Sequence, residues 1–157
     1  MIPPLLLAIS LCLAPSVPSS SMCSCVIGRT TDSARAVAEL GTDDVIFIGR
    51  VTSVVDTATE PGGVVHFRRA TFTVHQAWKG PLARSITIFT PASGGGCGFQ
   101  FAVGTQYLVF AMAEPNGVVH TRGCSPTQPL ATARKYLVGL GEPRIRYAPA
   151  DSGSQSR

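Results

Sequence analysis

The chain of 157 residues has the length of one domain, so it can form one packed core and hardly two. Hydrophobic residues make up 45% of it and charged residues only 14%, and it contains 16 Gly and 12 Pro, which is typical of a loop-rich globular protein and excludes a disordered or fibrous one. The formal net charge is +4, but the basic residues are scattered, with Arg68 and Arg69 as a close pair. We therefore expect no nucleic-acid partner, while weak binding to a polyanion stays open.

The pattern of residues 1–22 predicts a secretory signal peptide. The apolar run from Met1 to Ala14 is too short to span a bilayer, and small or polar residues follow it as far as Ser21. Cleavage before Met22 suits these small residues, and cleavage one position later would make Cys23 the first residue of the mature chain. We expect a secreted, extracellular protein without a membrane anchor.

Loss of residues 1–22 removes Cys12 and leaves an even set of cysteines, which is Cys23, Cys25, Cys97 and Cys124. Disulfides are the natural state of cysteines in an exported protein. A bridge between Cys23 and Cys25 would strain disulfide geometry, so each is expected to bond one of the two distant cysteines, and both such pairings stay open. Either pairing clamps the start of the mature chain to the body of the domain. The Cys-x-Cys spacing does not suit a structural zinc site.

The mature chain begins with a predicted helix and continues with strands. Asp32–Leu40 carries helix formers behind capping residues, and Gly41 follows as a stop. Apolar patterns of the β type occupy five segments, which are residues 45–55, 64–78, 84–90, 107–112 and 117–121. In the second segment the apolar residues change parity between Phe67 and Phe72, which predicts a β-bulge near residues 68–70.

A second helix is predicted over Leu130–Val138, ended by Gly139, and residues 142–157 are expected to form a flexible polar tail. Five strands with a helix at each end favour a mainly β fold, a five-stranded Greek-key barrel of the oligonucleotide/oligosaccharide-binding type with two or three short helices. The pattern alone would equally permit a sandwich. Residues 23–141 would form this one domain.

The sequence lacks the motifs of common enzymes. It contains no His-Glu-x-x-His, no Gly-x-Ser-x-Gly and no phosphate-binding loop, and the run Gly94–Gly98 is better explained as a close-packed turn around Cys97. His66, His75 and His120 lie in different predicted strands at no ligand spacing. We expect no enzyme activity and no cofactor.

Several short motifs occur in a family-specific order, which is Cys23-Ser-Cys25-Val26, Trp78-Lys-Gly80, Phe89-Thr-Pro91 ahead of Cys97-Gly98, Tyr107-Leu-Val-Phe-Ala111 and His120-Thr-Arg-Gly-Cys124. In this order they resemble the N-terminal inhibitory domain of the tissue inhibitors of metalloproteinases, a netrin-like domain. The resemblance covers about residues 23–140, nearly the whole mature chain.

The resemblance implies the disulfides Cys23 to Cys97 and Cys25 to Cys124. It also implies that the α-amine and carbonyl oxygen of Cys23 chelate the catalytic zinc of a target metalloprotease, and that Ser24 points into the specificity pocket of that enzyme. The surface that would contact the protease consists of Cys23, Ser24, Cys25, Val26, Gly95, Gly96 and Cys97. The zinc would belong to the partner, and the inhibitor would be a monomer.

A different class of function is also open. A netrin-like binding module would keep the barrel and use its basic surface, including Arg68 and Arg69, on a matrix polyanion or another protein. It would not inhibit proteases.

Overall fold

The computed structural model describes residues 43–58, 65–80, 83–92 and 97–148. The elements in chain order are β1 (Val45–Ala58), β2 (Val65–Lys79), β3 (Ser85–Pro91), β4 (Gln106–Ala113), β5 (Val119–His120), β6 (Gln128–Pro129), the 3-10 turn η2 (Leu130–Thr132), α2 (Arg134–Leu140) and β7 (Ile145–Arg146). The predicted signal peptide and the predicted helix Asp32–Leu40 lie outside the described residues.

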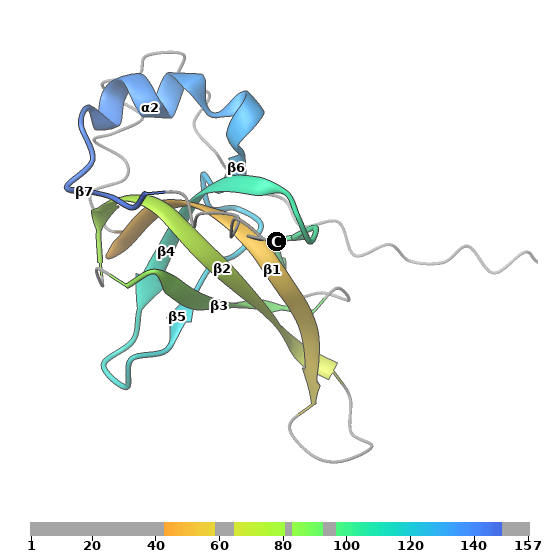
Figure 1. Cartoon of the computed structure of the whole chain (residues 1–157). Helices are drawn as coiled ribbons and strands as arrows, with labels where there is room; N and C mark the ends of the chain where they lie inside the picture. The colour runs from red at the N-terminus through yellow and green to blue at the C-terminus, as the bar shows by residue number, and fades with distance from the viewer. Residues whose placement is uncertain (1–42, 59–64, 81–82, 93–96, 149–157) are drawn as a thin grey trace, which may run out of the picture.

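Five strands close into a barrel (Figure 1). Around the barrel β1 pairs with β2, β2 with β3, β3 with β5, β5 with β4, and β4 again with β1. Every pair is antiparallel except β3 with β5, which is parallel and joins Phe89 to His120. The predicted mainly β fold with a five-stranded barrel is confirmed, it is consistent with the oligonucleotide/oligosaccharide-binding type, and the strands do not form a sandwich.

Residues 45–49 of β1 and 107–111 of β4 are buried on both faces, because they separate two apolar clusters. Inside the barrel, Phe47 and Val109 pack with Phe72 in the larger cluster. On the outside, Ile46 and Phe110 pack with Tyr136 of α2, which lies above the barrel in Figure 1. This second cluster explains why the sequence of β4 is continuously apolar where a strand with one wet face would alternate. In the described ranges no helix is long and apolar enough to cross a membrane.

The predicted β-bulge near residues 68–70 is wrong. The pairing of β1 with β2 runs without a shift from Ser53 opposite Thr71 to Thr57 opposite Phe67. The change of parity has another cause, since Phe67 points outward and is 50% exposed, whereas Phe72 is fully buried. No reversal of the inward face is needed when an aromatic residue lies on the outer face.

The irregularities of β2 lie on either side of the predicted position, one at His66 near its start and two closer to its end. Toward the end of the strand, register shifts leave His75 and Trp78 without a partner opposite them on β1. The first shift lets Val74 and Ala77 both face the barrel interior, although they are an odd number of positions apart. The second bulged residue, Trp78, joins the outer cluster under α2.

The C-terminal part also differs from the prediction. The expected helix over Leu130–Val138 is divided at Ala133 into η2 and α2, and Gly139 lies inside α2. The hydroxyl of Thr132 donates to the carbonyl of Pro129 at 2.9 Å, a local bond that favours the tighter turn. The helix ends at Gly141, whose φ of 64° is accessible to glycine.

Residues 142–148, assigned by the sequence to a flexible tail, pack on the barrel. Strand β7 pairs with Gln76 and Ala77 of β2, and the N–H of Tyr147 donates to the carbonyl of His75 at 2.8 Å. The bulge at His75 turns backbone groups outward, and β7 satisfies them. The rest of the predicted tail lies outside the described residues.

Candidate functional site

Of the residues predicted to contact a protease, only Cys97 is described, and Cys124 is described with it. Cys23, Ser24, Cys25, Val26, Gly95 and Gly96 lie outside the described residues. The predicted site is therefore seen from the side of the barrel that would hold it.

The structure brings Cys97 and Cys124 to the same place, although they are distant in sequence. The N–H of Gly123 donates a hydrogen bond to the carbonyl oxygen of Cys97, which joins the two cysteine segments. Both cysteines are disulfide-bonded, so neither offers a free thiol as a nucleophile or a metal ligand. The pairing with Cys23 and Cys25 stays a prediction.

Glycine permits the close approach of these segments. A Cβ on Gly98 would overlap the carbonyl of Pro91, at the end of β3, and a Cβ on Gly123 would lie 2.9 Å from the carbonyl oxygen of Cys97. Cys97 itself has a φ of 51°, the one positive value among non-glycine residues in the described part of the chain. Such a conformation costs roughly 1–2 kcal/mol and persists only where the surroundings fix it.

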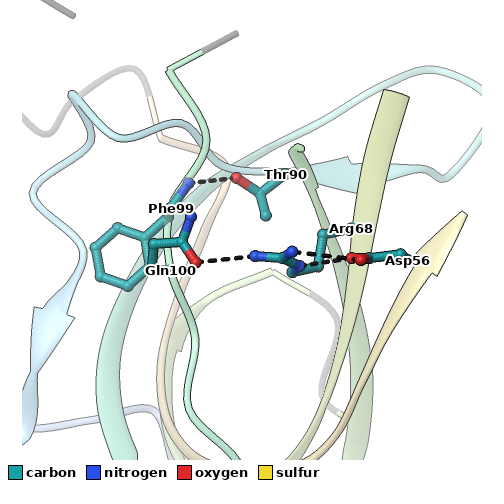
Figure 2. A network of polar contacts seen from close by, with 5 residues as sticks. All are labelled: Asp56, Arg68, Thr90, Phe99 and Gln100. Carbon is teal, nitrogen blue, oxygen red and sulfur yellow. Dashed lines mark hydrogen bonds and ion pairs between the residues drawn. The ribbon is translucent and has the colours of Figure 1, made fainter. Parts of the chain in front are cut away.

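The segment after Cys97 is fixed to β3 by a buried hydroxyl (Figure 2). The N–H of Phe99 donates to the Oγ1 of Thr90 at 2.7 Å, and Thr90 is completely buried. The ring of Phe99 stands edge-on to Tyr107, with 5.8 Å between the ring centroids. This bond and this ring contact fix the position at which Cys97 leaves the barrel.

Arg68 links the same segment to the β1–β2 hairpin (Figure 2). Its Nε donates to Asp56 Oδ1 at 2.7 Å and its Nη1 donates to Gln100 Oε1 at 2.9 Å. The hydrogen bond from Arg68 lowers the pKa of the Asp56 carboxyl, and that bond raises the pKa of Arg68 further above its usual range. The Asp56 side chain is half exposed, so solvent weakens the ion pair, and we assign Arg68 a positioning role.

The segment around Cys124 is fixed to β4 by three hydroxyl groups. Thr121 Oγ1, Ser125 Oγ and Thr127 Oγ1 lie 2.8, 2.8 and 3.0 Å from the carbonyl oxygen of Phe110. The N–H of Phe110 donates to Thr127 Oγ1 at 2.9 Å. The hydroxyls thus satisfy a strand edge that none of the described β-strands covers, and they hold the residues on both sides of Cys124.

A groove of about 350 Å³ lies beside the cysteine segments, and we call it the β2–β3–β5 groove. Its lining consists of Phe67, Phe89, Pro91, Glu114, Val118, His120 and Arg122. The apolar pattern of β2 does not predict this groove when a bulge at residues 68–70 is taken to turn Phe67 inward. The opposite parity of Phe67 and Phe72 was the signal that could have revealed it, since two residues five positions apart on a regular strand face opposite sides.

The described residues contain no group of three or more His, Cys, Asp or Glu that could hold a metal ion. His75 Nδ1 lies 3.1 Å from the side-chain nitrogen of Gln106, and His120 Nδ1 lies 3.5 Å from Glu114 Oε1. The second distance permits an ion pair when the ring is protonated, but its geometry is not that of a hydrogen bond. The two histidines therefore have separate, local partners.

No family model and no curated protein sequence matches the chain. The geometry around Cys97 and Cys124 is suited to holding a bonded segment rigidly at one end of a barrel. It offers neither a nucleophile next to a base nor a set of metal ligands among the described side chains.

Proposed function

We propose that this protein is a secreted inhibitor of zinc metalloproteases that acts without catalysis. The observation that carries the proposal is the meeting of the segments of Cys97 and Cys124, two disulfide-bonded residues, at the bond from Gly123 to Cys97. Bonded to Cys23 and Cys25, these neighbours would hold the N-terminus of the mature chain at two adjacent points. Such a terminus would project from the barrel as a rigid wedge.

The chemistry of the wedge follows from the open position of a catalytic zinc. The enzyme supplies three ligands and leaves one position for water, which the neutral α-amine and the carbonyl oxygen of Cys23 would occupy together. The nucleophilic water would be displaced, and no covalent step is needed. Ser24 would enter the specificity pocket, and its small size predicts that many pockets accept it.

Rigidity of the support would set the affinity of the wedge. Ordering a flexible terminus on binding costs roughly 0.5–1.5 kcal/mol per immobilised side chain, and a terminus that is already fixed avoids most of that cost. The bond from Phe99 to Thr90 and the hydroxyls around the Phe110 carbonyl supply this support from both sides. Inhibition should therefore depend on residues that never touch the enzyme.

The alternative, a polyanion-binding module, receives less support from the basic pair. Arg68 is engaged by Asp56 and Gln100, and Arg69 lies exposed on the other face of β2. Although Arg68 and Arg69 are adjacent in sequence, they do not form one basic patch that a polyanion could contact.

The test uses the free amine directly. Lys occurs only at positions 79 and 135, so the variant Lys79→Arg/Lys135→Arg keeps the α-amine as its sole primary amine. Acetylation of this secreted variant should abolish inhibition of zinc metalloproteases cleaving a peptide substrate, while the unfolding midpoint stays unchanged. The untreated variant should inhibit like the wild type. Full inhibition after acetylation, or none before it, contradicts the proposal.

A further inference from the structure

The β2–β3–β5 groove is a second candidate site on this domain, and its lining shares no residue with the predicted protease-contact surface. Its volume of about 350 Å³ is at the low end of the roughly 300–1,000 Å³ typical of ligand pockets. It lies on the outer face of the barrel, where Phe67 faces Pro91 and Phe89 faces His120 across adjacent strands. In Figure 1 these three strands run side by side.

The apolar part of the lining suits an aromatic side chain. Phe67 and Phe89 present rings, and Pro91 and Val118 complete the apolar surface between them. Phe67 is 50% exposed, which is a large exposed area for a phenylalanine on a strand. Aromatic pairs add about 0.5–1.5 kcal/mol to the area that they bury, so a ring is favoured over an aliphatic chain.

The charged part of the lining is asymmetric. Arg122 is exposed, and its guanidinium forms no hydrogen bond or ion pair with the described residues. Glu114 lies 3.5 Å from His120 Nδ1 and accepts a bond from Asn116 at 3.1 Å. The groove therefore offers an unused partner for a carboxylate at Arg122, and a carboxylate beside Glu114 would be repelled.

The exposure of the rim decides between a small molecule and a polypeptide. Small-molecule sites bury about 70–90% of their ligand, which this groove cannot do because Phe67, Glu114 and Arg122 are all exposed. A side chain that projects from a protein partner is shielded from solvent by the rest of that partner. A polypeptide segment is therefore the occupant that fits the shape.

We propose that the β2–β3–β5 groove binds a segment of another protein that carries an aromatic residue next to an acidic one. The ring lies between Phe67, Phe89 and Val118, and the carboxylate pairs with Arg122. The site does not use Cys23, so its occupation can be measured whether or not the protein inhibits a protease.

Three hexapeptides provide the test. The first is Ac-Gly-Ser-Phe-Asp-Ser-Gly-NH2, and the other two replace its Phe-Asp by Phe-Asn or by Ala-Asp. Binding is followed on the full secreted chain by NMR shifts at the groove, at low ionic strength. The Phe-Asp peptide should bind roughly 3- to 10-fold more tightly than the Phe-Asn peptide, and the Ala-Asp peptide should not bind measurably. In Arg122→Gln the preference for Asp over Asn should vanish, and Phe67→Ser should weaken both Phe peptides.

Arg134→Gln is the matched control, because Arg134 is exposed on α2 and does not line the groove. It should leave the preference unchanged. Equal binding of the Asp and Asn peptides, a preference that survives in Arg122→Gln, or no binding at millimolar peptide overturns the proposal. Tighter binding of free N-acetylphenylalanine than of the peptide, or a dimer of the chain that Phe67→Ser abolishes, would assign the groove to a different occupant and also overturn it.

Discussion

Replacing Thr127 by Val tests how strongly the loop of Cys124 is fixed to the barrel. The change keeps the shape of a side chain that is only 5% exposed, but it removes the acceptor of the Phe110 N–H. The Phe110 carbonyl keeps Thr121 and Ser125 as donors, so one buried N–H is left without a partner. Such a group costs about 1–3 kcal/mol, and we expect a loss of about 2 kcal/mol.

Urea unfolding measures this loss as a lower midpoint at an unchanged slope, and the thermal midpoint should fall by roughly 5–10 °C. Thr132→Val is the matched control, because its hydroxyl donates to Pro129 at 2.9 Å but is exposed. The control should stay within about 0.5 kcal/mol of the wild type. A loss at position 127 no larger than that of the control refutes the reasoning.

Three further predictions concern other parts of the fold. Gly98→Ala should lower the free energy of unfolding in urea by about 2–4 kcal/mol, because the new Cβ overlaps the end of β3. Gly117→Ala should cost about 1 kcal/mol, because its Cβ has nothing within 4 Å and only the positive φ of 84° is unfavourable. Equal losses would contradict the close approach at Gly98. Trp78→Phe removes the 2.9 Å bond from Nε1 to the Gly141 carbonyl, so trypsin should cleave faster in residues 142–148, and unchanged cleavage rates contradict this anchor. Burial raises the pKa of Asp43 from 3.8 to about 6, so its stabilising effect is complete below pH 3.8 and is lost as the pH rises through 6. The free energy of unfolding should therefore decline between these pH values, and Asp43→Asn should reduce this decline by about 1 kcal/mol, since the group is half exposed. Parallel curves of stability against pH for the variant and the wild type would contradict the assignment.

The strand pattern was readable from the sequence because most strands obey a local rule. Residues 107–111 are continuously apolar and form a strand buried on both faces, and residues 115–117 form the expected turn, with the N–H of Gly117 donating to Glu114. Closure of the barrel depends on the pairing of β1 with β4, which the apolar pattern does not specify. For that reason the sequence pattern alone did not distinguish a barrel from a sandwich.

The errors arose where tertiary contacts override the local pattern. Phe67 lies outward although it is aromatic, and a bulge was predicted to turn it inward, whereas its opposite parity to Phe72 on a regular strand already placed it on the outer face. Residues 142–148 were assigned to a polar tail, but Ile145 and Arg146 pair with β2, where a bulge at His75 leaves backbone groups to satisfy, and Tyr147 packs against the core. The meeting of Cys97 with Gly123 was likewise not encoded in any spacing, and the family resemblance implied only that Cys97 and Cys124 bond Cys23 and Cys25.

The central claim, inhibition through the amine of Cys23, is tested most directly at the N-terminus of the secreted protein. Intact mass and N-terminal sequencing identify the first residue of the mature chain. The account predicts a start at Cys23 with a free α-amine, which can bind zinc near neutral pH because its pKa is about 7.7–8.0. A start at Met22 would convert that amine into an amide, which cannot serve as the ligand, and would contradict the proposed mechanism.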